Sequence, residues 1–538
     1  MRNPARAQPP RLTLLDRALG AIGLQRAPAV QASMGGYAGA GYSERLMNWQ
    51  PGVADADSAA VRDLRELRAR SRDLVRNSPI AAGAQETQVT HIVGSGLTMQ
   101  SRLMVDVLGL DAEAAARWQS NVERRFALWA DSELCDATRE QTFYELQDLA
   151  LRTQLESGDA FAALVQVSNA PGDWPYSLAV QIIEADRVSN PLGQMDTPEL
   201  TAGIERNAAG AAIAAHVCSK HPGSLTSLTG ATWRRVEFRG ARSGRRNLLH
   251  LKRKLRPGQS RGIPALAPII GTLKQMARYS DAEIDAAVNA AAQAVFVRMD
   301  PDAFTELFDD EAQQTIVSKG MGWDGGLRAG RAVNLLPGES VESPALGRPN
   351  PNFDPFMTAF MRFVGVGLNI PAEVLSKHFQ SSYSAARAAL LDAWRTFNLR
   401  RKWLASRFCQ PVYEEWLADE VAAGRIAAPG FFADPMVRAA WCAATWSGDG
   451  PGAIDPLKEA KAMRERLDIG VTTLAEETVA HDGGDWETKH RQRTREVADR
   501  VRDGLQSPLQ APMARPAPAA EPPEAEPPEP EDDPEDMS

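Results

Sequence analysis

Residues 256–276 read RPGQSRGIPALAPIIGTLKQM, and they join two different kinds of sequence. The apolar run NLLHL at 247–251 precedes them, and a helix-like run begins at Pro264, since proline suits a first helical position. At the junction, residues 258–262 (GQSRG) fit the G-x-S-x-G pattern, which presents the nucleophilic serine of many hydrolases between a strand and a helix. The stretch is therefore either a nucleophile turn or a hinge between a β-rich part and a helical part.

A serine hydrolase of the α/β-hydrolase type is the less favoured of these two interpretations. Its nucleophile needs a histidine base later in the chain, and only His378, His481 and His490 follow Ser260. The helix should also start directly at the serine, so that backbone amides face the oxyanion. Because Pro264 comes four residues later, Ser260 would not lie in the first turn of that helix. We favour the hinge and keep a hydrolase using Ser260 as the alternative.

Other signals of enzymatic chemistry are missing from the sequence. It contains neither G-x-x-x-x-G-K-[ST] nor H-E-x-x-H, and no two histidines are spaced for a common helical face. The four cysteines lie far apart and form no C-x-x-C pair, which favours free thiols. We therefore expect no catalytic residue, no metal site and no cofactor.

The net charge of −9 comes from one end of the chain. Residues 521–538 hold nine acidic and no basic residues, which leaves 60 acidic against 60 basic residues elsewhere. Bulk positive charge for nucleic-acid binding is thus absent, although a neutral body can still handle DNA if its charges are sorted by surface. No stretch approaches the roughly 20 apolar residues of a membrane helix, and no secretory signal is evident. We expect an intracellular, soluble protein.

The first half of the chain has the pattern of an α+β domain. Helices are expected over 61–90, where Pro79 opens a second helix, and over 112–130 and 138–157. The run HIVGSGLTMQSRL at 91–103 favours a strand with a glycine bend. Further strands are expected at FAALVQV (161–167), SLAVQIIEA (177–185) and across most of 201–251.

The second half is mainly helical. An apolar helix is expected to end near Gly365–Gly367, and a long helix from Ala385 should be interrupted by Pro411. The long helix carries an apolar stripe with helical spacing, which predicts a core face: Leu390, Trp394, Phe397, Leu404 and Phe408. A compact helical section should follow over 430–500, and the Pro/Glu-rich end from Gln506 lacks the apolar residues needed for order.

Seven segments stand out along the chain. They are RDLVRNSPIAAGAQETQVTHIVGSGL (72–97), EADRVSNP (184–191), RPGQSRGIPALAPIIGTLKQM (256–276), LLPGESV (335–341), GVGLNIPAEVLSKHFQSSYSAARAALLDAWRTF (365–397), RRKWLASRF (400–408) and WSGDGPGAIDPLKEAKA (446–462). Taken in order, they resemble the lambda family of phage portal proteins, and the chain keeps that family's order and spacing from about residue 37 to 500.

The resemblance implies a portal fold that assembles as a dodecameric ring around a central channel. Double-stranded DNA would pass through it without sequence specificity during packaging and ejection. The implied partners are the terminase large subunit, head-completion or connector proteins, and the major capsid protein or scaffold, with no membrane involved. The implied location is the portal vertex of the virion, and the host cytoplasm during assembly.

Mapped by order, the resemblance also implies a division of the chain. The parts are a flexible N-terminal arm (1–59), an α+β wing (60–262), a first stem helix (263–294), a clip (295–348), a second stem helix (349–375), a tunnel loop (376–384), a long wing helix (385–429), a helical crown (430–503) and a disordered acidic tail (504–538).

Three sets of functional residues follow from this map. A DNA-facing tunnel loop would contain Lys377, His378, Phe379, Gln380, Ser381, Ser382 and Tyr383. A stem hinge would contain Gly258, Arg261, Gly262 and Pro264, with Arg261 held by a neighbouring carboxylate. Subunit packing would use Phe356, Phe360 and Phe363.

Plainer interpretations of the same residues stay open. The loop aromatics Phe379 and Tyr383 could belong to the core, and the second stem helix could be buried inside one subunit. The basic cluster at 400–402 could make intersubunit ion pairs or face water, and the basic stretch 248–262 could approach DNA or form a solvated turn. If Ser260 is no nucleophile, Ser260→Ala should be nearly silent, whereas a bulky residue at Gly262 should impair folding.

Overall fold

The computed structural model describes residues 48–167, 174–224, 230–291, 295–297, 309–321, 332–334, 350–379, 382–452 and 455–505. The chain divides into two compact units, Met1–Asp55 and Ala56–Ser538, and all elements below belong to the second. Most of the expected N-terminal arm and clip, the loop residues Gln380 and Ser381, and the acidic tail beyond Leu505 lie outside the described residues.

Two helices open the second unit, α2 (Ala56–Asn77) and α3 (Pro79–Ile92). Ser78 caps α3 by accepting a hydrogen bond from the amide of Ala81, and Pro79 occupies the first turn as expected. The strand expected from His91 begins only at Thr98, with β1 (Thr98–Ser101), because α3 continues through Ile92.

The chain then forms a three-stranded antiparallel sheet, in the order β3-β2-β8. Its strands are β2 (Asp159–Gln166), β3 (Leu178–Glu184) and β8 (Leu248–Lys252). Phe161 stands opposite Ile183 on one side and His250 on the other. The helices that precede the sheet are α4 (Val105–Leu108), α5 (Ala112–Ala130), the 3-10 turn η2 (Glu133–Cys135) and α6 (Phe143–Ser157).

A second antiparallel sheet has the order β4-β5-β6-β7. Its strands are β4 (Leu200–Thr201), β5 (Ile204–Arg206), β6 (Ala212–Cys218) and β7 (Trp233–Glu237), and the 3-10 turns η3 (Ala185–Arg187) and η4 (Pro191–Gly193) precede it. It shares a small core with the first sheet through Phe161, Ile183 and Ile204. The expected α+β character of this part is confirmed.

The helix expected from Pro264 starts later, and this prediction was wrong. A 3-10 turn, η5 (Ala267–Ile269), leads into α7 (Ile270–Ala291). The backbone just before η5 makes a tertiary hydrogen bond instead of a helical one, since the amide of Ala265 donates to the carbonyl of Leu155 at 2.8 Å. That bond ties the segment to the end of α6 and delays the helix.

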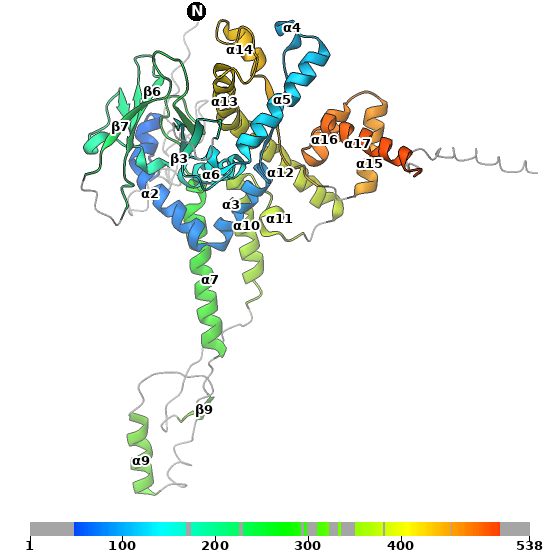
Figure 1. The fold of residues 1–538 in the computed structure, drawn as a ribbon. Helices are drawn as coiled ribbons and strands as arrows, with labels where there is room; N and C mark the ends of the chain where they lie inside the picture. Colours follow the sequence, from blue (N-terminus) through cyan, green and yellow to red (C-terminus); the bar gives the residue numbers. More distant parts are fainter. Residues whose placement is uncertain are drawn as a thin grey trace, which may run out of the picture. The chain divides into compact units, whose positions relative to one another are not determined.

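Two helices run side by side away from the sheets, α7 and α10 (Phe353–Leu368), as Figure 1 shows. Between them in the chain, β9 (Val295–Val297) pairs in parallel with β10 (Ala332–Asn334), and α9 (Asp310–Met321) separates these strands in sequence. After α10 comes the short helix α11 (Ala372–Ser376).

A long helical rod follows, made of α12 (Tyr383–Leu404), the π-helical turn η6 (Ala405–Cys409) and α13 (Gln410–Ala422). The helix was expected to be interrupted at Pro411, and this prediction was wrong. The amide of Gln410 donates to the carbonyl of Ala405, and this wider π-helical turn accommodates the proline within the rod. The stripe prediction is confirmed, since Trp394, Phe397, Leu404 and Phe408 are buried and Leu390 packs against the core.

The last part contains α14 (Pro435–Trp441), β11 (Ala444–Ser447), α15 (Pro456–Asp468), α16 (Leu474–Asp482) and α17 (Trp486–Arg502). It is not purely helical as expected, because β11 pairs antiparallel with β1. Trp441 and Trp129 belong to one main core, so residues up to β11 are part of the same body.

The four cysteines are free and buried, as expected: Cys135, Cys218, Cys409 and Cys442. Across the described part of the chain, no helix is long and apolar enough to cross a membrane.

Candidate stem hinge, stem surface and tunnel loop

The predicted hinge is built around Asp159, the fully buried first residue of β2. Its carboxylate accepts from Arg261 Nε at 2.7 Å, from Arg68 at 2.8 Å and from the Gly262 amide at 3.0 Å. His250 Nε2 lies 3.1 Å away. Burial alone would raise the pKa of Asp159, but the charges of Arg261 and Arg68 outweigh burial and hold the pKa well below its usual value. Asp159 therefore stays ionised inside the protein.

Arg261 is also buried, and it satisfies its remaining donors on the backbone. It donates to the carbonyls of Val188 and Ala202 at 2.7 Å and of Ala185 at 2.6 Å. The expectation that a carboxylate holds Arg261 is confirmed by its contact with Asp159. The solvated-turn interpretation holds only for the middle of this basic stretch, where residues 254–258 are exposed; it is wrong for Gln259, Ser260 and Arg261, which are all buried.

A second layer of charges connects α2 to the same cluster. Arg68 donates to the Ser157 carbonyl at 2.9 Å and lies 3.5 Å from Asp186, which also pairs with Arg72. Burial lowers the pKa of Arg68 to about 10, and the adjacent charge of Asp159 opposes that shift. The start of β2, the turn η3 and helix α2 are thus fastened to the hinge.

Ser260 is closed off from solvent, with 0% of its surface exposed. Its amide and its hydroxyl both donate to the carboxylate of Asp57 at 2.6 Å. Its carbonyl accepts from Lys252, whose pKa burial lowers to about 8. In the described chain the hydroxyl is therefore paired with a carboxylate, not a histidine, and no substrate can reach it. The hydrolase alternative has no support.

Two glycines of the hinge are required for different reasons. A Cβ atom on Gly262 would lie 1.9 Å from the carbonyl oxygen of Gly158, so only hydrogen fits there. Gly258 has a φ of +80° but faces open space, and its carbonyl accepts from Arg206 at 2.7 Å. Pro264 is buried directly after the turn. Residue 262 must therefore be glycine because the Gly158 backbone lies against it, and residue 258 favours glycine because its backbone is left-handed.

Helix α10, the predicted second stem helix, has one face against the body and one face uncovered. Val364 and Leu368 are buried, whereas Phe356 is 41%, Phe363 67% and Val366 78% exposed. Phe360 packs partly on the main core and contacts the ring of Phe356 in a tilted arrangement, at 4.6 Å between ring centroids. Burial inside one subunit is therefore wrong for the exposed face.

The neighbouring helix α7 continues this apolar surface. Tyr279 contacts Phe356 at 4.7 Å and Phe353 at 5.7 Å between ring centroids. Further along α7, Ile284 and Val288 are 58% and 60% exposed. We call the exposed apolar side chains of α7 and α10 the stem surface: Ile284, Val288, Phe356, Phe363 and Val366.

The predicted tunnel loop connects α11 to α12. Lys377 ends α11 with a left-handed backbone, φ 55°, and Phe379 is 49% exposed, so its placement in the core is wrong. The His378 amide donates to the Glu373 carbonyl at 3.2 Å. Ser382 caps α12 and Tyr383 is already its first residue, which makes the loop shorter than expected. Gln380, Ser381 and the Tyr383 side chain lie outside the described part.

Within the basic cluster at 400–402, Arg401 fits neither interpretation, whereas Lys402 is exposed, as the water-facing interpretation expected. Its guanidinium donates to four backbone carbonyls within the chain, those of His91, Ile92, Gly448 and Asp449, at 2.9 to 3.2 Å. It joins α12 to the end of α3 and to the segment after β11, rather than pairing with another subunit or facing water.

Sequence reasoning found Arg261 and the glycines but missed Asp159 and Arg68. The available signal was SGDAF at 157–161, where a charged residue opens an apolar strand directly after a helix. A carboxylate at such a position needs a buried cationic partner. Among the residues described, no group of three His, Cys, Asp or Glu side chains could hold a metal ion.

Comparison with known proteins identifies the family to which the chain belongs. Residues 42–401 match the family described as "Phage portal protein, lambda family", which is well over half of the chain. The chain therefore belongs to the lambda family of phage portal proteins, and its function is that of a phage portal.

Two curated relatives agree. The portal protein of Escherichia phage N15 is 28% identical over 484 residues, covering 86% of this chain and 89% of that protein. Portal protein B of Escherichia phage lambda is 26% identical over 482 residues, with the same coverage. A chain in the virion of a native gene transfer agent particle covers 71% of this chain and 93% of its own length, at 14% identity. Its TM-score of 0.36 is too low to support a claim about the fold.

Proposed function

We propose that twelve copies of the chain form a ring at one vertex of a phage capsid, and that double-stranded DNA is packaged and ejected through its channel. The family match supports the portal function. The observation that carries the ring is the stem surface, because a single chain leaves this apolar face of α7 and α10 uncovered.

Exposed apolar side chains of this size favour a partner. Burying a Phe or Val side chain contributes roughly 1.5–3 kcal/mol, and contiguous apolar surface on a soluble protein commonly marks an interface. In a ring the interface is head-to-tail, so the stem surface of one copy would pack on a different side of the stem helices of the next copy. The stem helices of neighbouring subunits would then line the channel together.

The buried cluster at the hinge would fix how the stem leaves the body. Arg261 holds the residues just before α7 to Asp159 and to three carbonyls of the sheet region. Twelve stems must leave their bodies at the same angle to close a ring. A rigid joint at 258–264 suits this requirement better than a flexible one.

The loop after α11 is the proposed DNA contact, with Lys377, His378 and exposed Phe379 at its described start. A channel for DNA of any sequence should contact phosphates and read no bases. One lysine per subunit gives a sparse ring of positive charge, and tight phosphate binding would stall movement of the DNA.

The remaining parts of the proposal follow from the family. The mapped wing, clip and crown would meet the major capsid protein or scaffold, the terminase large subunit, and the head-completion or connector proteins. The ring would assemble in the host cytoplasm and remain in the virion. The chain would act as a structural component rather than an enzyme.

Sedimentation of stem variants tests the ring. Phe363→Ser should shift the protein from a ring of about 700 kDa, twelve copies of 58.4 kDa, to smaller species, because each contact loses roughly 1–2 kcal/mol of apolar burial. Met436→Ser on α14 is the matched control, since Met436 is 66% exposed but lies outside the stem. If both variants sediment like the unmodified protein, the stem surface is not the ring interface.

A further inference from the structure

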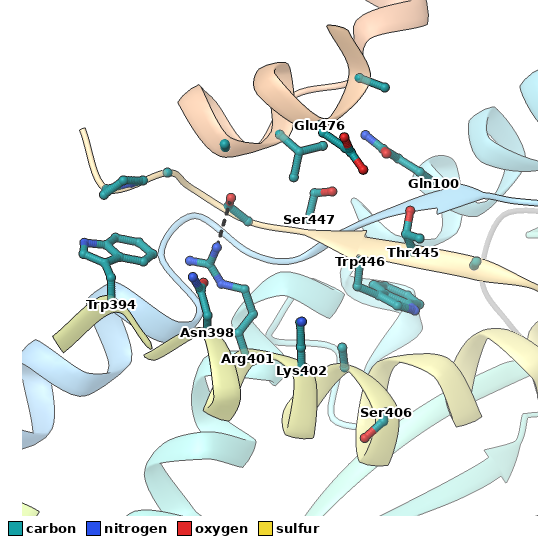
Figure 2. A pocket seen from close by; sticks show the side chains of 18 of the residues that line it. Gln100, Trp394, Asn398, Arg401, Lys402, Ser406, Thr445, Trp446, Ser447 and Glu476 are labelled. Carbon is teal, nitrogen blue, oxygen red and sulfur yellow. Dashed lines mark hydrogen bonds between the residues drawn. The ribbon is translucent and has the colours of Figure 1, made fainter. Parts of the chain in front are cut away.

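A pocket of about 1120 Å³ lies between α12, the β1–β11 pair and α16. Figure 2 shows Arg401 and Lys402 pointing from α12 toward β11, with Glu476 of α16 on the opposite side. None of the residues assigned above to the hinge, the stem surface or the tunnel loop lines it. The portal function described so far leaves this pocket without a role.

The walls of the pocket carry an excess of positive charge. Four cationic side chains line it, those of Arg102, Arg395, Arg401 and Lys402. The acidic side chain in the lining is Glu476, whose carboxylate already accepts from the Thr473 amide at 3.1 Å at the start of α16. Arg395 and Lys402 are both exposed on α12, and among the described residues neither side chain has a hydrogen bond or an ion pair. These two cations are therefore available to an anionic ligand.

The same pocket has an apolar, aromatic side. Trp394, Trp446 and Val479 line it alongside the cations. Indole rings are a common surface for proline, and proline-rich peptides dock in aromatic-lined grooves because little entropy is lost on binding. A pocket with both features suits an extended peptide that alternates acidic residues with prolines.

We propose that this pocket binds the acidic tail of the chain, residues 521–538, EPPEAEPPEPEDDPEDMS. This segment offers nine carboxylates and six prolines and has no basic residue. Its carboxylates would pair with Arg395 and Lys402. Its prolines would pack on Leu391, Trp446 and Val479, which line the pocket and are not fully buried. The sequence of the tail thus complements the pocket in charge and in apolar character.

The connection is long enough for the tail to reach the pocket. The 15 residues 506–520 separate the described end of the chain at Leu505 from the acidic segment. Such a length spans at most about 50 Å. The tail has to run back along α17, which is about 25 Å long and begins shortly after α16, a wall of the pocket. Tethering also raises the local concentration of the tail to the millimolar range. Duplex DNA, the competing anion, lacks this advantage.

Zero-length carbodiimide cross-linking of the full chain tests the proposal, because it joins a lysine to a carboxylate only when the two are in contact. Cross-links from 521–538 to Lys402 should exceed those to Lys461 at least tenfold, and 0.5 M NaCl should abolish them. Lys461 is the matched control, since it is exposed on α15, lies outside the pocket and is nearer to the tail in sequence. Equal cross-linking of both lysines would overturn the proposal.

A pocket variant that keeps Lys402 makes the test independent of the reactive lysine. Arg395→Glu in the full chain should lower the Lys402 cross-link at least fivefold and leave Lys461 unchanged. An unchanged Lys402 cross-link would count against the pocket as the binding site. A duplex DNA oligomer, added in equal phosphate, should not displace the tail. Protection of Lys402 by DNA with no tail cross-link would assign the pocket to nucleic acid instead.

Discussion

At the scale of single residues, the hinge predicts a specific dependence on pH. Burial lowers the pKa of His250 to about 4 from its usual 6.5, although its contact with Asp159 opposes the shift. The folded protein therefore keeps His250 neutral, whereas the unfolded chain binds a proton below about pH 6.5. Because of His250, the free energy of unfolding should fall by about 3 kcal/mol as the pH drops from 6.5 to 4. The depressed pKa of Asp159 adds a further loss only below about pH 4, its unfolded value.

Urea unfolding at pH 7 and pH 4.5 measures this effect. His250→Gln keeps an N–H donor for Asp159 but does not titrate, so it should lose much less stability between the two pH values than the unmodified protein. Comparing the two proteins isolates His250, because Glu123, whose pKa burial raises to about 7, is present in both. Equal losses in both proteins would show that His250 does not control this pH range.

Two glycines of the hinge should differ in how much stability the protein loses when each is replaced by alanine. Gly262→Ala places a methyl group against the Gly158 carbonyl and should cost more than about 4 kcal/mol, or prevent folding. Gly258→Ala is the matched control, because it meets open space and should cost only the roughly 1–2 kcal/mol of a left-handed backbone. Thermal unfolding of the two variants gives the comparison. Similar melting temperatures would mean that the contact between residues 158 and 262 is not tight.

The buried contact of Ser260 changes an expectation drawn from the sequence. Ser260→Ala removes the hydroxyl that donates to Asp57 at 2.6 Å, so it should destabilise the fold by about 1–3 kcal/mol rather than be silent. Urea unfolding measures the loss. Treatment with a fluorophosphonate should leave the serine unlabelled in the native protein, since it is fully buried. Labelling at Ser260 would restore the hydrolase alternative.

For single residues, the sequence predicted only what a turn requires from its own residues. Arg261 and Gly262 stand out because a turn between two elements calls for glycine and for a held charge. Their partners could not be found in this way, because Asp159 lies 102 positions from Arg261 and Asp57 lies 203 positions from Ser260. Only the folded chain brings these residues together.

At the scale of elements, Arg401 is expected to hold three segments together. Arg401→Lys retains the charge, but a single ammonium group cannot reach four carbonyls of α3 and the segment after β11. We expect a loss of about 2–4 kcal/mol and faster hydrogen exchange at residues 91–96 and 445–450. Exchange in α6 should stay unchanged.

Arg407→Lys is the matched control for this prediction. Arg407 is exposed on the π-helical turn η6 of the same rod, so its replacement should alter neither stability nor exchange. If Arg401→Lys behaves like Arg407→Lys, the hydrogen bonds of Arg401 do not fasten α12 to its neighbours.

Strongly periodic elements were predictable and others were not. The helix expected at 112–130 matches α5, and the apolar stripe of α12 is in the core, because local spacing decides both. The strand β11 was missed because its partner β1 lies 349 positions away at Thr98 and Ser447. The late start of α7 was missed because a tertiary bond from Ala265 to Leu155 decides it.

At the scale of the whole molecule, family membership came from the order of motifs along the chain rather than from any single motif. GQSRG alone allowed either a nucleophile turn or a hinge, and only its surroundings favoured the hinge. The stem surface was predictable in part, since Phe356 and Phe363 stand on a helix that is apolar on two faces. Which of those faces stays uncovered depends on packing against the main core, and the sequence does not specify it.

The central claim is that this chain forms a ring through its stem surface, and native mass spectrometry of the purified full-length protein tests it most directly. Twelve copies of 58.4 kDa should give one dominant species of about 700 kDa at micromolar concentration. Phe363→Ser should reduce that species while the chain stays folded. A protein that remains at 58.4 kDa at every concentration and in every buffer would contradict the account.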